Sequence, residues 1–332
     1  MNAKYFISGT TAFQLWRANR FPPNTFAVQA NIAFEPSYPS GTNREMLTNW
    51  LIDSKTQPPY CFLVSDPHQR RSASGCFATQ LGKSFPDEGS FYRIVDQRIA
   101  SAPFELYIAS PELSFIQMAH LFSFVQTVGY GYELCGTYTP EESAKDEPVK
   151  LLRLSSAERL AEYCNEMPGK HGIARARKAL PWIIDNSSSI RETELAMMFV
   201  LSKRLRGFAT MKPTLNYSVS PKGKRKSFVS QDEFSIDLCW PDFNVGIEVE
   251  STKFHAGKHK RIRDARRRNS LQYLGFTIIQ ATQGDLSSAL GIAGLGIQLY
   301  EAMGIRPRRN QFDVDLPTLD LYKEIFDLSN YP

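Results

Sequence analysis

The sequence predicts an α/β protein in which a C-terminal mixed β-sheet flanked by helices follows an N-terminal α+β domain. Three observations lead to this prediction. The 332 residues are 42% hydrophobic and 12% aromatic, enough for a sizeable core and, by length, for two domains. The stretch 234–250, FSIDLCWPDFNVGIEVE, alternates apolar and polar residues on both sides of a turn, as a β-hairpin does. Helical patterns precede and follow this hairpin, which favours a sheet covered by helices.

The composition also indicates a compartment. Five widely spaced cysteines include no Cys-x-x-Cys pair, which fits a reducing cytoplasm without structural disulfides or a structural zinc site. The N-terminus lacks a basic segment followed by an apolar run, and no stretch approaches the ~18 apolar residues of a membrane span. We therefore expect a cytoplasmic protein that does not associate with membranes.

The elements of the N-terminal part follow from short apolar segments and one strong helix start. Ser110, Pro111 and Glu112 suit the N-cap, the first helical position and the first turn. We expect this helix to extend to Val125. The other elements expected are helices over 11–17, 157–166 and 173–184, and strands over 61–64 and 104–108.

A polar, acidic segment with two prolines, Thr139–Lys150, is the candidate linker. We place the division between domains soon after it, with residues 1–170 in the N-terminal domain and 171–332 in the C-terminal one.

The C-terminal elements have a clearer pattern. Ser189 and Glu192 fit a capping box that begins a helix, and Gly207 is expected to end it. After the hairpin we expect a helix over 261–274, a buried strand over 276–282 and a final helix over 287–303.

The hairpin concentrates acidic side chains on one face. Folding it about Asp242 and Phe243 sets Asp237 opposite Glu248, with Glu250 one step further along the same face. The other face is expected to be apolar, with Ile236, Leu238 and Trp240 opposite Val249, Ile247 and Val245. Three neighbouring carboxylates repel one another unless a divalent cation or a proton lies between them. Metal-dependent hydrolysis is therefore the leading hypothesis.

Basic residues surround this acidic hairpin. Between Lys203 and Arg268 there are sixteen Lys and Arg against seven Asp and Glu, although the whole chain carries only +5. Such a setting suits a polyanionic substrate, whose phosphates the carboxylates alone would repel. The alternative is a solvated basic helix face. Two clusters hold most of the basic charge: Lys222, Lys224, Arg225 and Lys226, then Lys258, Lys260, Arg261, Arg263, Arg266, Arg267 and Arg268.

The order of these elements and acids resembles the restriction-endonuclease-like PD-(D/E)xK superfamily, and residues 189–286 are most similar to small Vsr-like endonuclease domains. The matching residues are Ser189-Ile190-Arg191-Glu192-Thr193, Asp237-Leu238-Cys239-Trp240-Pro241, Glu248-Val249-Glu250-Ser251, His255, Asp264, Arg267, Thr282 and Asp285-Leu286.

The resemblance implies a Mg²⁺-dependent deoxyribonuclease, with Mn²⁺ as a substitute. Asp237, Glu248 and the carbonyl of Val249 would bind the metal, and Glu192 would join them directly or through water. Glu194 competes for the role of Glu192. Glu250 stands where the superfamily has lysine, so it would serve as a base or second-metal ligand, and Lys253 would supply the missing cation.

Several cations are candidates for contacting nucleic acid, which by this resemblance is DNA. An ordinary structural role for His255, and an Asp264–Arg267 salt bridge, remain alternatives. The candidates are Lys224, Arg225, Lys226, Lys253, His255, Lys260, Arg263 and Arg267.

The N-terminal segments SGTTAFQLWR, ASPELSFIQMA and GYELCGTY resemble regions of AbiEi-like proteins. We expect an endonuclease acting in defence or repair. The alternatives are a non-catalytic DNA-binding regulator, such as the antitoxin partner of a cognate toxin, and a protein-interaction module.

Overall fold

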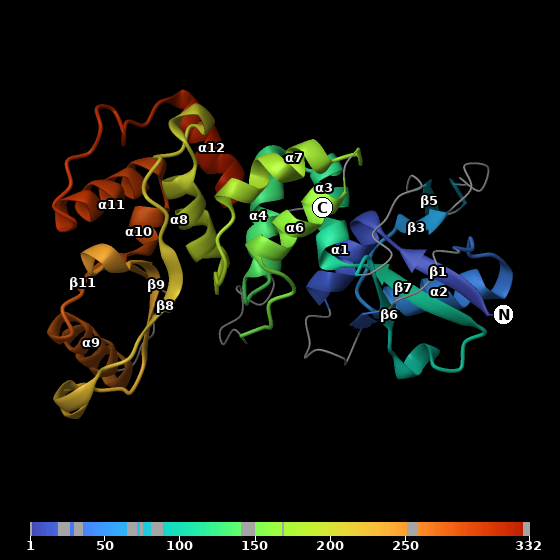
Figure 1. Ribbon diagram of the computed structural model, residues 1–332, viewed down its shortest axis with the longest axis horizontal. Helices are drawn as coiled ribbons and strands as arrows, with labels where there is room; N and C mark the ends of the chain where they lie inside the picture. The colour runs from blue at the N-terminus through green and yellow to red at the C-terminus, as the bar shows by residue number, and fades with distance from the viewer. Residues whose placement is uncertain are drawn as a thin grey trace. The chain divides into compact units, whose positions relative to one another are not determined.

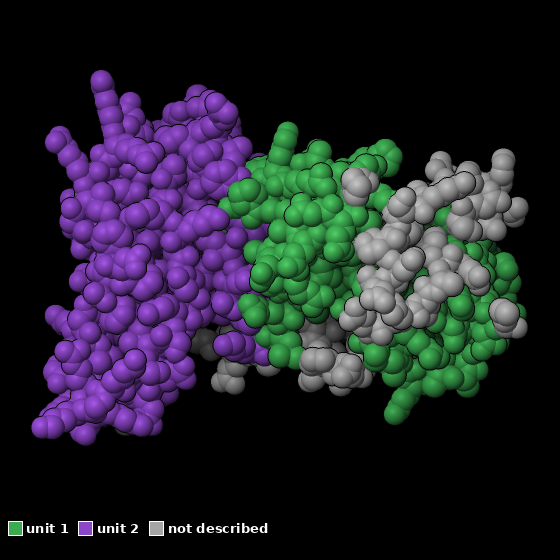
Figure 2. All heavy atoms as spheres, in the orientation of Figure 1, with its two compact units in different colours: residues 1–134, 151–181, 332 green, residues 135–150, 182–331 purple. Residues whose placement is uncertain are grey.

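The computed structural model describes residues 2–18, 27–29, 36–64, 72–73, 76–80, 89–140, 150–167, 169–250 and 258–327. It is an α/β protein with two mixed β-sheets (Figure 1). The chain forms two compact units, one of residues 1–134, 151–181 and 332 and one of 135–150 and 182–331 (Figure 2). The sequence predicted a division after residue 170. In the structure, the segment 151–181 still belongs to the first unit, so the break falls after Pro181.

The first unit is built on a seven-stranded sheet in the order β2-β6-β7-β1-β3-β5-β4. Buried aromatic rings pack on its central strands, where Phe6 lies 4.9 Å from both Phe91 and Tyr107, measured between ring centroids. The strands are β1 (Ala3–Ile7), β2 (Ala27–Gln29), β3 (Tyr60–Val64), β4 (Ser72–Ala73), β5 (Cys76–Gln80), β6 (Phe91–Ile94) and β7 (Phe104–Ala109). The helices are α1 (Gly9–Ala18), α2 (Gly41–Asp53), α3 (Pro111–Leu121), α4 (Phe124–Cys135), α6 (Ala157–Glu166) and α7 (Ile173–Ala179), with 3₁₀ turns η2 (Gln97–Ile99) and η3 (Leu180–Trp182).

Most of the elements predicted here are present, and two helices are shorter than predicted. The Ser110 hydroxyl accepts a hydrogen bond from Leu113 N and caps α3, as expected. However, α3 ends at Leu121, and Val125 belongs to α4, because Ser123 and Gln126 form a reciprocal capping pair that starts a new helix. The helix predicted over 173–184 ends at Ala179, since Pro181 cannot donate within an α-helix.

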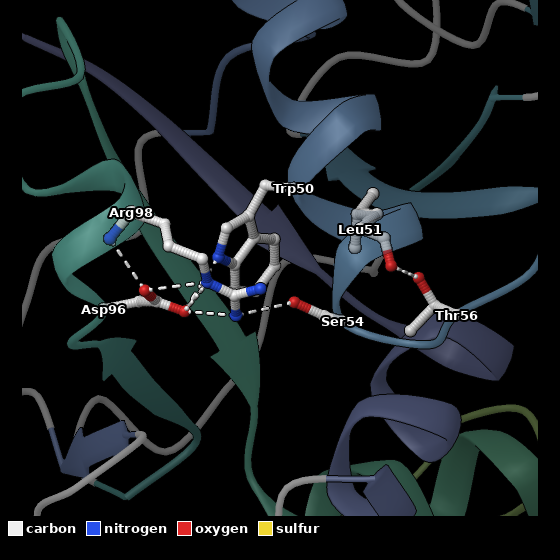
Figure 3. A network of polar contacts seen from close by, with 6 residues as sticks. All are labelled: Trp50, Leu51, Ser54, Thr56, Asp96 and Arg98. Atoms are coloured by element: carbon white, nitrogen blue, oxygen red, sulfur yellow. Dashed lines mark hydrogen bonds and ion pairs between the residues drawn. The ribbon is translucent and has the colours of Figure 1, made fainter.

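A polar network joins α2 to the turn before β7 (Figure 3). Asp96 caps η2 by accepting from Arg98 N, and it also accepts from Trp50 Nε1 at 3.0 Å. Burial alone would raise the pKa of Asp96, but the hydrogen bonds from Arg98 and Trp50 lower it. The Arg98 guanidinium reaches the Ser54 hydroxyl, while Thr56 bonds Leu51 O, so the end of α2 is held by structural contacts.

The second unit is built on a four-stranded sheet in the order β11-β10-β9-β8, in which only the β10–β11 pair is parallel. Its strands are β8 (Thr214–Val219), β9 (Phe234–Trp240), β10 (Val245–Val249) and β11 (Thr277–Ala281). Its helices are α8 (Ile190–Val200), α9 (Lys258–Tyr273), α10 (Gln283–Leu286), α11 (Ala289–Ala302) and α12 (Leu316–Phe326), with 3₁₀ turns η4 (Lys203–Leu205), η5 (Gly223–Phe228) and η6 (Pro241–Phe243).

Three differences from the prediction concern this unit. Helix α8 ends at Val200 rather than near Gly207, because the amides of Phe208, Ala209 and Thr210 return to bond the carbonyls at its end. Strand β8 was not predicted, although Leu215, Tyr217 and Val219 alternate with polar residues. Helix α12 was also missed, although Asp315 caps it and Pro317 lies in its first turn.

Buried side chains cover both faces of this sheet. Helix α8 is buried over Glu192–Val200, and its Phe199 ring lies 6.3 Å from that of Trp240 on β9. Leu271 of α9 lies in a second cluster with Phe234, Ile236 and Cys239. In the described part of the chain, no helix is both long and apolar enough to cross a membrane.

Candidate functional site

The β9–β10 hairpin has the predicted turn and register. Trp240 pairs with Val245, Cys239 with Gly246 and Leu238 with Ile247, and Asn244 closes the turn in a left-handed conformation with φ of 52°. Counted away from the turn, the last paired residues are Leu238 and Ile247, and Asp237 and Glu248 are the next residue on each strand. The acids therefore lie where the two strands cease to pair.

The strict alternation predicted for β9 is wrong at Ile236. Instead of sharing a face with Leu238 and Trp240, Ile236 packs with Cys239. A Cβ atom on Gly246, the partner of Cys239, would meet Ile236 Cγ2 at 2.4 Å. The neighbouring strand is irregular at the same level, where Asn216 has φ of 48°. The interruption therefore falls at Asp237 itself, which frees its side chain from the regular pleat.

Asp237 uses this freedom to bond the opposite strand, since its Oδ2 accepts from Val249 N at 2.8 Å. Burial and the charge of Glu192 raise the pKa of Asp237 well above its ordinary value, and the charge of Glu248 raises it further. The Val249 hydrogen bond and the charge of Arg267 act in the opposite direction. The acids that act on Asp237 are thus Glu192 and Glu248, with Arg267 against them, whereas Glu250, the third acid of the predicted hairpin cluster, is exposed.

Glu192 lies at the start of α8 and is almost fully buried. The Ser189 hydroxyl caps the helix by accepting from Glu192 N, which confirms half of the predicted capping box. The Glu192 carboxylate bonds Ser188 N in place of Ser189 N. It also accepts from the Ser188 and Ser189 hydroxyls and from Asn216 Nδ2, at 2.7–2.9 Å. Burial raises the pKa of Glu192 despite these four hydrogen bonds.

Glu248 has a cationic partner that the sequence did not identify. Its Oε1 lies 2.6 Å from Arg267 Nη1 of α9, and its Oε2 accepts from Gln280 Nε2 at 3.3 Å. The guanidinium approaches Oε1 off the direction of an N–H bond, so this buried oxygen has no hydrogen-bond donor among the described residues. Arg267 also bonds the Ser235 carbonyl. Gln280 is the one amide side chain in the largely apolar strand β11, and this feature of the sequence could have indicated that it contacts Glu248.

Glu194, the alternative to Glu192, takes part in a different cluster. Its carboxylate accepts from Arg191 Nη1 at 2.8 Å, and the Arg191 guanidinium lies over the Phe326 ring of α12. Burial raises the pKa of Glu194 to about 7, against the lowering effect of Arg191. Glu194 therefore belongs to the contact between α8 and α12.

This shift predicts a pH dependence of stability. The folded-state pKa exceeds the unfolded one, so between pH ~4.5 and ~7 the folded state retains a proton that the unfolded state has lost. The free energy of unfolding should then fall as pH rises through this window, by an amount on the order of 3 kcal/mol. Glu194→Gln should reduce this slope in urea unfolding at pH 5 and pH 8, and the part that remains comes from Asp237 and Glu192, whose pKa values are also raised. A slope as steep in this variant as in the matched Glu301→Gln control, which alters an exposed residue, would contradict the assignment.

The remaining predicted residues are placed as follows. Glu250 is exposed just after β10, and its amide donates to Ala281 O. Lys224, Arg225 and Lys226 are exposed in η5, where Lys226 lies 3.1 Å from Asp232, and Arg263 is exposed on α9. Thr282 and Asp285 form the capping box of α10, a structural role. Lys260 lies in α9, with its side chain outside the description, and Lys253 and His255 lie outside the described residues.

Mg²⁺ prefers oxygen ligands and is commonly held by one or two carboxylates with water. Asp237, Glu248 and the Val249 carbonyl supply oxygen donors of this kind, although Glu248 Oε1 is ion-paired with Arg267 and Asp237 Oδ2 accepts from Val249 N. Within the described residues, no group of three or more His, Cys, Asp or Glu is arranged to hold a metal ion. The Glu192 carboxylate already accepts four hydrogen bonds.

Comparison with known proteins gives few relatives. No family model and no solved structure matches the chain. An uncharacterized protein of Mycobacterium tuberculosis, found in strains CDC 1551 and H37Rv, is 27% identical over 141 residues. The match covers 42% of this chain and 47% of the relative, so the chain spans about half the length of the curated relatives it matches.

Proposed function

We propose that the C-terminal unit is a Mg²⁺-dependent endonuclease that hydrolyses DNA phosphodiester bonds at Asp237 and Glu248. The observation that carries the proposal is the placement of Asp237, which is partly buried beside two further acids at the point where the β9–β10 hairpin stops pairing, surroundings that raise its pKa. A divalent cation relieves this repulsion. The order α8, β8, β9, β10, α9, β11 contains the order of elements on which the resemblance to restriction-endonuclease-like domains rests, with β8 added.

In this proposal Asp237, Glu248 and the Val249 carbonyl hold the cation, and Glu192 positions Asp237 through charge. Bound Mg²⁺ supplies a water of lowered pKa and neutralises charge on the phosphate. Exposed Glu250 accepts the proton of the attacking water, whose oxygen bonds phosphorus while the bond from phosphorus to one sugar oxygen breaks and that oxygen takes a proton from solvent water to leave as a hydroxyl. Arg263 and the cations of η5 hold neighbouring phosphates.

The second candidate is a non-catalytic DNA-binding regulator, which in the antitoxin case would have a cognate toxin as its protein partner. It is favoured by the Glu248–Arg267 ion pair, because an arginine there supplies the positive charge that a metal would otherwise provide. The acid at Glu250, in place of the superfamily lysine, favours it too. In this case the basic surface binds DNA and the acids are structural.

A plasmid-nicking assay separates the two functions. The full chain should nick supercoiled DNA with Mg²⁺ or Mn²⁺, and neither EDTA-treated protein nor Glu248→Gln should do so. Asp242→Asn, at an exposed acid in the hairpin turn, is the matched control and should retain activity. Salt-sensitive DNA binding without nicking in any metal, unchanged in Glu248→Gln, would replace the first function by the second.

A further inference from the structure

Two large aromatic side chains lie exposed next to each other in the second unit. Phe228 ends η5 with 73% of its surface exposed, and Tyr273 ends α9 with 52% exposed. Their ring centroids are 6.4 Å apart and their planes are inclined by 57°. Figure 1 shows the turn, in gold, beside α9. An aromatic pair left in water by a folded unit is costly, so it calls for an explanation.

Side-chain and backbone bonds hold the pair in place. The Ser230 amide and hydroxyl lie 3.1 and 3.2 Å from the Ser270 hydroxyl on α9, two and three residues from the respective rings. Val229, between Phe228 and Ser230, packs against the cluster that contains Leu271. The rings are therefore presented to solvent by an anchored turn and a helix end.

The surroundings of the pair are positively charged. Lys224, Arg225 and Lys226 precede Phe228 in η5 and are exposed. On α9, Arg266 lies seven residues before Tyr273 and so shares its helical stripe, and it too is exposed. Arg267, on another face, is held by Glu248. The charge at the pair thus suits an anion with flat apolar groups.

We propose that Phe228 and Tyr273 form a stacking platform for unpaired bases of single-stranded nucleic acid, whose phosphates contact Arg266 and the cations of η5. Aromatic faces stack on bases only where these are not already stacked in a duplex, and base–aromatic stacking beside a basic groove is how proteins bind single strands. The inference rests on the proposed function and narrows its substrate to DNA with a single-stranded or splayed segment.

Binding of a fluorescein-labelled thymidine oligonucleotide, measured by anisotropy in EDTA, tests the platform apart from cleavage. Phe228→Ala and Tyr273→Ala should each weaken single-strand binding by about 5- to 150-fold, the range for losing one stack. Binding of a duplex of equal length should change less than twofold. Tyr273→Phe should retain binding, because it keeps the ring.

A control variant, a variant of a phosphate contact and a fluorescence readout make the result specific. Leu290→Ala removes an equally exposed apolar side chain, 70% exposed, from α11 and should leave both affinities unchanged. Arg266→Gln should weaken single strands and duplexes alike and reduce the salt dependence of binding. A 2-aminopurine base in the oligonucleotide should be quenched by the wild type and not by the double alanine variant.

Equal loss of single-strand and duplex binding in the alanine variants would overturn the platform, as would wild-type protein that binds neither. The binding assay contains no metal, so its result does not depend on cleavage. If the wild type does not nick plasmid DNA but still binds single strands more tightly than duplex, the endonuclease is rejected and the platform is kept. If the wild type nicks plasmid DNA but neither Phe228→Ala nor Tyr273→Ala changes binding, the platform is rejected and the endonuclease is kept.

Discussion

Asp237→Asn should abolish cleavage and at the same time make the folded protein more stable. The carboxyl group is partly buried beside Glu192 and Glu248, and its raised pKa means that ionising it opposes folding. Asparagine has the same shape and keeps an oxygen to accept from Val249 N, but it carries no charge. The free energy of unfolding at pH 7 is therefore expected to be higher in Asp237→Asn than in the wild type.

Activity should change in the opposite direction. Loss of a metal-binding carboxylate should lower the nicking rate by on the order of 10³-fold, which equals about 4 kcal/mol of activation free energy. Urea unfolding and plasmid nicking on the same preparations check both parts. An Asp237→Asn protein that nicks normally, or is less stable than wild type at pH 7, would show that the acids are not a strained metal site.

Arg267→Gln should destabilise the protein without metal and make it more responsive to metal. Removing the guanidinium leaves the Glu248 carboxylate, 13% exposed, without its cation and removes the Arg267 hydrogen bond to the Ser235 carbonyl. Breaking a partly buried ion pair from one side costs about 2–3 kcal/mol, because the remaining charge stays desolvated. A divalent cation then supplies the missing charge.

Thermal unfolding with and without Mn²⁺ measures this competition. Mn²⁺ should raise the Tm of Arg267→Gln by more than that of the wild type, since only the wild type has an arginine competing for Glu248. The neighbouring exposed Arg268→Gln is the matched control and should behave like the wild type. If the Tm of Arg267→Gln were unaffected by Mn²⁺, Arg267 would be a structural partner of Glu248, as the regulator hypothesis requires.

The sequence alone predicted the hairpin well, because alternation over both strands and a turn-forming Asp-Phe-Asn segment determine the register together. It could not show that the ladder stops before Asp237, since the irregular residue that accompanies the break, Asn216, lies on β8, which was not predicted. The choice of Glu192 over Glu194 relied on resemblance. In the structure Glu192 acts on Asp237 through its charge while Glu194 is paired with Arg191, and a role for Glu192 at a metal stays a prediction.

Long-range pairs were harder to predict. The Glu248–Arg267 contact joins β10 to α9, and a run of adjacent arginines gives no signal as to which one turns inward. The missing helix α12 packs against α8 through the Phe326 contact with Arg191, which depends on tertiary structure rather than on local propensity. The exposed positions of Phe228 and Tyr273 are likewise a property of the fold, since aromatic residues are usually assigned to the core.

Calorimetric titration with Mn²⁺ at pH 6, in buffers of different ionisation enthalpy, tests the metal site most directly. We predict one metal ion per chain, binding lost in Asp237→Asn and Glu248→Gln, and proton release in the wild type that increases as the pH is lowered, because burial and the neighbouring acids raise the pKa of Asp237 and a bound metal ion would lower it. Absence of binding in the wild type, or binding unchanged in both variants, would contradict a metal site at Asp237 and Glu248.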